Sequence, residues 1–321
     1  MTTFWFCVLG VLLATYFALG GIDYGVGLLL PTMRGEDERR RALNAIGPMF
    51  LGNEVWIVGA VGVLIAAFPR IEAGLFGATY PLLVAVLLGL VAVNAGVQLR
   101  SRGRRRRGFD ALIALASATL AIGWGVLLGA LVTGLPLTGG GQVAGFRTLL
   151  TPYAMICGVA NGLLVLAHGT AFLAWRTGKI RAGGARPAFV AAALAVLVPV
   201  VGAVQGTVAR NPGSATVLVV VIACAAAGAG VALRRGRLGL AFLATTVATA
   251  LPVVAAGVAL YPDVLVSTVD PAGTVSVAGG AAGDGALRIL LFAAGPLLPV
   301  LVAVQVAGWW LFRRRPVTVY W

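Results

Sequence analysis

Residues 4–31 read FWFCVLGVLLATYFALGGIDYGVGLLLP, and this stretch decides the fold class of the chain. The run is apolar for longer than the roughly 20 residues that a helix needs to cross the hydrocarbon core of a bilayer. Because backbone groups in lipid must hydrogen-bond within the protein, a run of this length predicts a transmembrane helix. It lacks the positive first segment and the cleavage site of a secretory signal, so we expect it to remain as the first span.

The rest of the chain has the same character. Of its 321 residues, 60% are hydrophobic and only 11% are charged, and the mean hydropathy is +0.99. A soluble domain could not cover its surface with so few polar residues. The sequence therefore predicts an all-α integral membrane protein, with one membrane domain over residues 1–321. The expected helices lie near 4–31, 46–68, 75–99, 110–134, 149–175, 187–208, 214–233, 238–260 and 287–312.

The positive charges alternate between the connections of these nine spans. All but four of the 24 basic residues fall in every second connection or at the carboxyl end. They are Arg34, Arg39 to Arg41, Arg100, Arg102, Arg104 to Arg107, Arg176, Lys179, Arg181, Arg186, Arg234, Arg235, Arg237 and Arg313 to Arg315; the four on the other side are Arg70, Arg147, Arg210 and Arg288.

The positive-inside rule places the basic connections in the cytoplasm. Nine spans then put the amino terminus outside and the carboxyl terminus inside. The same pattern accounts for the net charge of +14, so we expect no nucleic-acid partner.

A few polar residues interrupt the apolar spans at a similar depth. Asp23, Glu54 and His168 each lie eight residues, or about 12 Å, from the expected cytoplasmic end of a span. We expect them to converge between the first, second, third and fifth spans as a hydrated polar cluster. Its expected members are Asp23, Asn53, Glu54, Asn94, Gln98 and His168.

Three interpretations of this cluster stay open. Buried carboxylates and amides can hydrogen-bond one another and fix helix packing. Carboxylates and a histidine in sequence can also relay protons. A secondary transporter could use the same groups to bind an ion or a substrate. Asp110 and Glu72 lie at predicted span ends, where we expect them to be solvated.

The sequence offers few ligands for a metal or a haem. It has one histidine, and no pair among its three cysteines has the spacing of a metal site. A haem with two histidine ligands needs a second histidine, and the methionines show no supporting pattern. We therefore expect no metal, no haem bound by this chain alone and no catalytic residue in it.

Several motifs resemble subunit II of the cytochrome bd quinol oxidases. The first is GIDYGVG at 21–27, and GNEVW at 52–56 and AAFP at 66–69 follow in the same order and spacing as in that family. HGTAFL at 168–173 and Tyr261-Pro262 resemble later family segments. The residues that carry the motifs are Gly21, Gly25, Gly27, Gly52 and Trp56.

This resemblance implies two four-helix bundles plus one extra helix, in a multi-pass protein of the bacterial inner (plasma) membrane. It implies a partner, subunit I, which carries haem b and haem d and passes electrons from quinol to dioxygen. Subunit II of the family binds no haem, supports its partner and in some members lines a proton path. Membrane lipid and small accessory subunits are further expected partners.

The chain departs from the family at three positions where members usually carry acidic groups. Gly20 precedes the first motif, Leu51 precedes the second, and Gln98 lies near the inner end of the third span. These neutral residues favour an assembly role with a reduced part in proton uptake. A secondary transporter and a divergent scaffold paralogue remain the alternatives.

Overall fold

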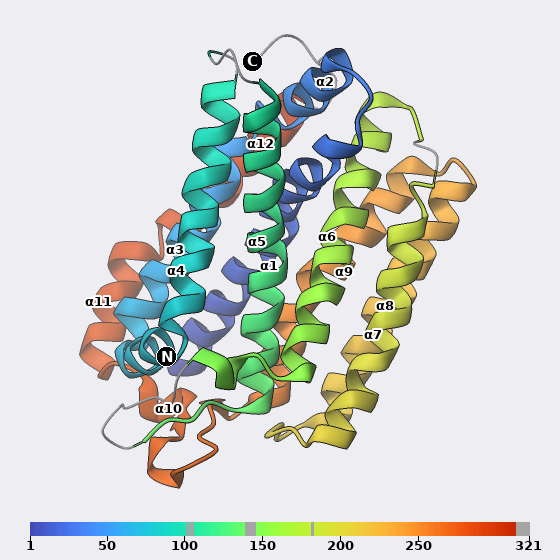
Figure 1. Cartoon of the computed structure of the whole chain (residues 1–321). Coiled ribbons are helices and arrows are strands. Elements are labelled where there is room, and N and C mark those ends of the chain that lie inside the picture. The colour runs from blue at the N-terminus through green and yellow to red at the C-terminus, as the bar shows by residue number, and fades with distance from the viewer. Residues whose placement is uncertain (101, 103–105, 139–145, 181–182, 313–321) are drawn as a thin grey trace.

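The structure is a computed structural model that describes residues 1–100, 102, 106–138, 146–180 and 183–312 (Figure 1). Long helices lying side by side make up most of it. The helices are α1 (Thr2–Leu29), α2 (Glu36–Ile46), α3 (Phe50–Ala67), α4 (Pro69–Arg100), α5 (Arg106–Thr133), α6 (Pro152–Thr177), α7 (Arg186–Gln205), α8 (Pro212–Arg234), α9 (Leu238–Leu260), α10 (Val277–Gly280), α11 (Asp284–Ala294) and α12 (Leu297–Phe312).

The remaining elements are short and lie in the connections. Two strands pair antiparallel between α9 and α11, in the region that the sequence presents as a long loop. These elements are the 3₁₀ helices η1 (Leu30–Thr32), η2 (Phe146–Leu149) and η3 (Pro271–Gly273), and the strands β1 (Asp263–Leu265) and β2 (Val275–Ser276).

Within the described residues, nine helical segments are long and apolar enough to span a membrane, which confirms the predicted number. Three of them begin four or more residues from the predicted start. The second span begins at Phe50 rather than near 46, the third at Pro69 rather than near 75, and the fourth at Arg106 rather than near 110. The last span consists of α11 and α12, which are separated at 295–296 because Pro296 has no N–H to continue the helix.

Helix α1 lies at the centre of the molecule and packs against α3, α5, α6 and α9 (Figure 1). It forms one four-helix bundle with α3, α4 and α5, while α6 to α9 form the second. Helix α12 lies outside both bundles and has no buried residue within the described chain. The predicted arrangement of two bundles plus one helix is confirmed.

Glycines bring α1 and α6 into backbone contact. A Cβ atom added to Gly25 would lie 2.7 Å from the Cα atom of Gly169, closer than real Cβ atoms approach other atoms. Gly21 lies one turn earlier on the same face, where a Cβ would lie 3.6 Å from the ring of His168. Residues four apart share a helix face, so this spacing turns one side of α1 toward α6.

The connection between the first two spans contains a helix that lies outside the nine predicted spans. Helix α2 begins after Gly35 and carries three acidic residues in its first turn, where negative charge favours a helix start. Its second half is buried, including Leu43 and Ile46. This amphipathic helix packs against α1 and α6 at the end of the bundle.

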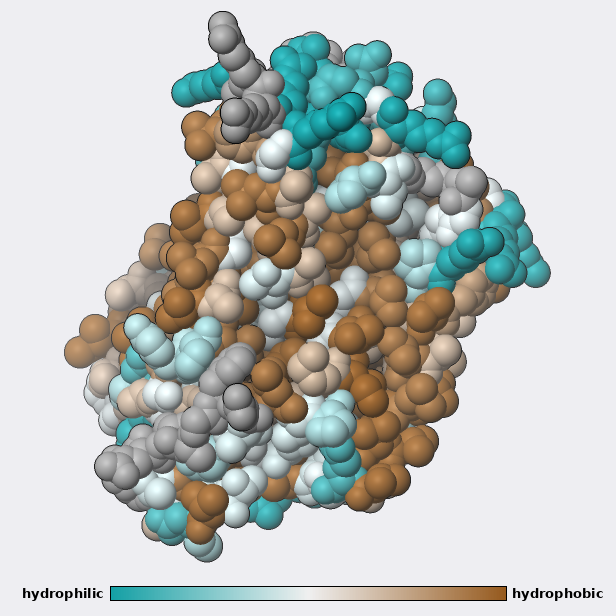
Figure 2. Space-filling model, in the orientation of Figure 1, coloured by the Kyte–Doolittle hydropathy of each residue, from teal (hydrophilic) through white to brown (hydrophobic). Residues whose placement is uncertain are grey.

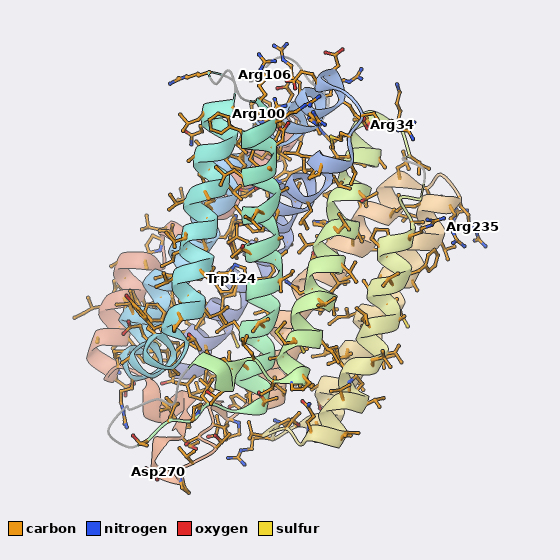
Figure 3. All side chains as sticks on the ribbon, viewed as in Figure 1. Arg34, Arg100, Arg106, Trp124, Arg235 and Asp270 are labelled. Atoms are coloured by element: carbon orange, nitrogen blue, oxygen red, sulfur yellow. The ribbon has the colours of Figure 1, made fainter. Side chains whose placement is uncertain are left out.

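Charge separates the two ends of the molecule. Arg34, Arg100, Arg106 and Arg235 lie at one end, and Asp270 lies at the opposite end (Figure 3). We call these the arginine end and the Asp270 end. Hydrophilic residues gather at both ends, and a broad hydrophobic belt lies between them (Figure 2). Several of the basic residues on which the topology prediction depends lie outside the described residues: Arg104, Arg105, Arg181 and Arg313 to Arg315.

We predict that Gly25→Ala destabilises the protein, because the added methyl group has no room against the backbone of α6. Overpacking of this kind costs about 1–3 kcal/mol. Gly10→Ala in the same helix is the matched control, since a Cβ there meets no atom within 4 Å. Thermal unfolding of the purified chain in detergent should show a lower melting temperature for Gly25→Ala alone. Equal melting temperatures for the two variants would contradict the close approach of α1 and α6.

Candidate functional site

Asp23 of α1 is the most deeply buried carboxylate of the first bundle, with 3% of the residue exposed. The Nδ2 atom of Asn53, on α3, donates to Asp23 Oδ2 at 3.0 Å and to the carbonyl oxygen of Leu19 at 3.2 Å. Gln305 of α12 donates in turn to Asn53 Oδ1 at 3.1 Å. Three helices thus meet through one chain of side-chain hydrogen bonds that ends on Asp23.

Glu54 belongs to a second polar pair. Asn94 of α4 donates to Glu54 Oε1 and also to the carbonyl oxygen of Leu90 at 3.0 Å. Glu54 is half-buried, so this pair lies nearer the surface of the bundle than Asp23 does. The contact joins α3 to α4 in the same way that Asn53 joins α3 to α1.

The two pairs are connected through α3, because Asn53 and Glu54 are consecutive residues. Within the described residues, Asp23 Oδ1 and Asn94 Oδ1 have no hydrogen-bond partner. Each pair therefore retains a buried oxygen that can accept a further hydrogen bond. Burying such an acceptor without a partner costs free energy.

His168 lies apart from these pairs, which corrects the expectation of a single cluster. Its Nε2 atom lies 2.9 Å from the carbonyl oxygen of Ala18, and its Nδ1 atom lies 2.8 Å from Thr245 Oγ1. A carbonyl only accepts, so Nε2 carries the proton and Nδ1 accepts from the threonine. The physical reason for the separation is helical periodicity: Ala18 and Asp23 lie on different faces of α1.

Gln98, the remaining predicted member, is exposed on α4, one turn beyond Asn94. The structure thus brings together Asp23 with Asn53, and Glu54 with Asn94. Sequence reasoning did not select Gln305, the isolated polar residue of the last apolar run, or Thr245, whose hydroxyl orients His168. The signal for Gln305 was present, because an amide in an otherwise apolar span needs a partner.

The motif residues position the turn of α1 that carries Asp23. Gly21 and Gly25 face α6, whereas Gly27 faces Ser117 and Ile113 of α5, so neighbouring helices approach on two sides. Gly52, the glycine of the second motif, lies against Gln305, since a Cβ there would meet Gln305 Oε1 at 3.7 Å. Trp56, the last residue of that motif, is buried in the core. The motifs thus support the polar pairs mainly through close packing.

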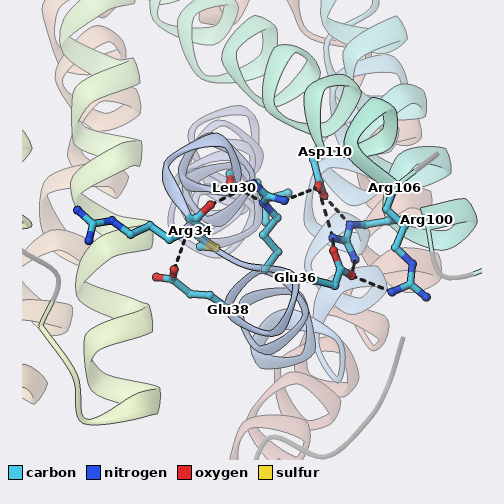
Figure 4. Close-up of polar contacts among 9 residues, drawn as sticks. Leu30, Arg34, Glu36, Glu38, Arg100, Arg106 and Asp110 are labelled. Atoms are coloured by element: carbon cyan, nitrogen blue, oxygen red, sulfur yellow. Dashed lines mark hydrogen bonds and ion pairs between the residues drawn. The ribbon is translucent and has the colours of Figure 1, made fainter. Parts of the chain in front are cut away.

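A charged network lies at the arginine end (Figure 4). Arg100 of α4 donates from Nε to Asp110 Oδ1 at 2.5 Å, and its two terminal nitrogens contact Glu36 at 3.1 and 3.0 Å. Arg106 contacts Glu36 Oε1 at 3.0 Å, and Arg39 lies 3.7 Å from Asp110. These pairs fasten α2 to α4 and α5.

The expectation that Asp110 is solvated is wrong. The residue is only 5% exposed, because Arg100 folds over it and supplies the opposite charge that burial requires. Glu36 is the more accessible acid of the network. Burial alone would raise the pKa of Glu36, but Arg100 and Arg106 outweigh that effect and hold its pKa below the ordinary value.

Comparison with known proteins assigns the family. The family model described as cytochrome bd terminal oxidase subunit II matches residues 1–312. The chain belongs to the cytochrome bd terminal oxidase subunit II family.

Relatives within the bd subunit II family agree along most of the chain. The chain is 29% identical to cytochrome bd ubiquinol oxidase subunit 2 of Bacillus subtilis, over 97% of this chain and 95% of the relative. It is 32% identical to cytochrome bd-I ubiquinol oxidase subunit 2 of Escherichia coli, over 54% of this chain and 48% of the relative. The fold is similar to that of a chain in the bd oxidase structure from Geobacillus thermodenitrificans, with a TM-score of 0.77, 15% identity and coverage of 98% and 99%.

The one histidine of this bd subunit II is already engaged by its neighbours. Both ring nitrogens of His168 are engaged, and its ring stacks on Phe242 at a centroid distance of 5.2 Å. Iron ligation would require breaking one of these hydrogen bonds and opening the packing of α1, α6 and α9. The part of the chain that the structure describes also contains no group of three or more His, Cys, Asp or Glu side chains that could hold a metal ion.

The Glu36 pairs predict a pH dependence at the arginine end. Since the folded protein lowers the pKa of Glu36, the pairs add stability that is fully present above pH ~4.3, the ordinary value for glutamate. This stability is lost as the pH falls through the lowered folded value. We expect Glu36→Gln to lower the melting temperature at neutral pH and to differ less from the unsubstituted protein in acid.

Asp37→Asn is the matched control, because Asp37 lies in the same helical turn and is exposed. Its melting temperature should stay close to that of the unsubstituted protein at both pH values. A pH dependence shared by Glu36→Gln and the unsubstituted protein would show that the Glu36 pairs add no stability.

Proposed function

We propose that this chain is the haem-free subunit of a quinol:oxygen oxidoreductase, and that it acts in a complex with a haem-bearing subunit I. Haem b and haem d, quinol oxidation and dioxygen reduction are assigned to that partner. Two findings support the assignment: the family to which the chain belongs, and the engagement of both nitrogens of its one histidine. The Bacillus subtilis and Escherichia coli relatives are named as ubiquinol oxidase subunits.

Within that complex, Asp23 and Glu54 are proposed to carry protons from the arginine end toward the partner. The observation that carries this proposal is the pair of consecutive residues on α3: Asn53 contacts Asp23, and Glu54 carries the second carboxylate. Buried carboxylates that share hydrogen-bonded neighbours are suited to passing protons inside a membrane.

The proposed proton role is a reduced one. Gly20 and Leu51, at which the sequence resemblance implies lost acidic groups, cannot exchange a proton. Within the described residues, no direct hydrogen bond joins Asp23 to Glu54, so a proton would need an intervening donor and acceptor. The same contacts also hold α1, α3, α4 and α12 together. The alternative to proton transfer is that the polar pairs serve only this helix packing.

The charge pattern supports an orientation in which the arginine end faces the cytoplasm of a bacterium. The amino terminus then lies outside the plasma membrane and the carboxyl terminus inside. Exposed apolar residues such as Leu51, Val58 and Val304 lie on α3 and α12. They provide a surface for lipid, for subunit I and for small accessory subunits.

The proton role is tested by replacing each carboxyl group with its amide in the assembled oxidase. We expect Asp23→Asn and Glu54→Gln to slow quinol oxidation roughly tenfold or more, because a positioned proton-transfer group contributes about 100-fold where no other path exists. Proton uptake should slow in parallel with turnover. The haem absorption spectrum of the complex reports whether assembly is intact.

Glu72→Gln is the control, because Glu72 begins α4 at the end of that helix opposite Arg100. Normal turnover in all three variants would leave only the structural role of the polar pairs. Failure of the chain to co-purify with a haem protein would instead contradict the oxidase assignment itself.

A further inference from the structure

An open pocket of about 650 Å³ lies at the arginine end, where α2 and α5 begin. The residues that line it include one acid, Glu36, and four arginines, Arg34, Arg39, Arg106 and Arg107. Several of these residues belong to the charged network that Figure 4 shows. Because positive side chains outnumber the negative one, the lining favours an anionic occupant.

Glu36 does not neutralise this pocket, because both of its oxygens are already engaged. Oε1 accepts from Arg100 at 3.1 Å and from Arg106 at 3.0 Å, and Oε2 accepts from Arg100 at 3.0 Å. Asp110, the other acid of the network, is paired with Arg100 and Arg39. Three arginines thus share two acids, and the network itself carries one positive charge in excess.

Two consecutive arginines of the lining have donors to spare. Arg106 uses one terminal nitrogen for Glu36, and 48% of its side chain is exposed. Arg107 is exposed and forms no ion pair with another described residue. A guanidinium group carries five N–H donors in a planar fork that matches the oxygens of a phosphate. Both side chains can therefore donate to a phosphate in the pocket.

The first turn of α5 adds backbone donors at the same place. Arg106, Arg107 and Gly108 begin this helix, so their N–H groups have no partner within it. A Cβ atom added to Gly108 would meet no atom within 4 Å, so the backbone of this turn is open. The turn contains no acidic residue, and its partial positive charge adds to that of the arginines.

An apolar strip runs from the pocket along the outside of α5. Gly108, Leu112 and Leu115 share a helix face, because they are four and three residues apart. Leu112 is 40% exposed and Leu115 is 69% exposed, and both belong to a segment that can span a membrane. They lie about 6 and 10 Å below Gly108, at the depth of acyl chains. A molecule with its anionic group in the pocket can thus lay a hydrocarbon chain on this strip.

We propose that the pocket binds the headgroup of an anionic phospholipid whose acyl chain lies on Leu112 and Leu115. The phosphate accepts hydrogen bonds from Arg106, Arg107 and the first turn of α5. A zwitterionic lipid also has a phosphate, but the positive excess of the pocket repels its ammonium group. The site is separate from the polar pairs within the spans, so it stands independently of the proposed function.

The proposal is tested by native mass spectrometry of the full-length chain in detergent. The chain is titrated with dioleoylphosphatidylglycerol or with dioleoylphosphatidylcholine, which have the same chains but differ in net charge. We expect the phosphatidylglycerol to bind at least about tenfold more tightly, since each basic residue attracts an anionic lipid by about fivefold.

A soluble headgroup separates a lipid site from a site for free phosphate. Glycerol 3-phosphate at the same concentration should leave the bound phosphatidylglycerol in place, because it lacks the chains that lie on α5. Displacement by glycerol 3-phosphate would overturn the proposal, since it would show that the pocket takes a soluble phosphate.

One substitution tests the pocket itself. Arg107→Gln breaks no ion pair among the described residues and should weaken phosphatidylglycerol binding about fivefold, with phosphatidylcholine binding unchanged. Arg235→Gln is the matched control, because Arg235 is exposed at the same end of the molecule but does not line the pocket (Figure 3). It should bind both lipids as the unsubstituted chain does.

Equal binding of the two lipids by the unsubstituted chain would overturn the proposal. An equal loss of phosphatidylglycerol binding in Arg107→Gln and Arg235→Gln would overturn it as well, because net charge and not the pocket would then attract the lipid. The comparison of the two lipids needs no variant, so it does not depend on how the substituted chains fold.

Discussion

Contact between the backbones of Gly25 and Gly169 determines where α1 lies, and the pair of Asp23 and Asn53 depends on that position. Only glycine on each helix permits the approach, which turns one face of α1 toward α6. The opposite face, carrying Leu19 and Asp23, is thereby directed at α3. A carboxylate that pointed into lipid would be costly, so close packing on one side makes the buried acid on the other side tolerable.

Polar groups in this molecule are sheltered by different means at different depths. In the interior, Asp23 and Glu54 are matched with amides, which donate hydrogen bonds without adding charge. At the arginine end, Asp110 is matched with the guanidinium of Arg100, where water is nearer and an ion pair is less costly. Among the described residues, the ion pairs thus lie at the ends of the molecule, and the carboxylates within the spans have neutral partners.

The number of spans and the carboxylates of the two polar pairs, Asp23 and Glu54, were predictable, because apolar length and isolated charges are properties of local sequence. The helical nature of 36–46 was missed because its polar first half obscured the apolar face formed by Leu43 and Ile46. The placement of His168 was also missed. Depth along a span can be counted from sequence. Which neighbouring helix a residue contacts depends on how the helices pack, and His168 contacts Thr245 of α9.

The most direct test of this account is a double-mutant cycle between Asp23 and Asn53, measured by thermal unfolding of the purified chain. If the two side chains are partners, Asp23→Asn and Asn53→Asp each destabilise, and the exchanged pair recovers much of the loss. The account predicts a coupling energy of about 0.6 kcal/mol or more, the average that double-mutant cycles give for interhelical hydrogen bonds in membranes. Strictly additive effects would contradict it, because they would show that Asp23 does not face α3.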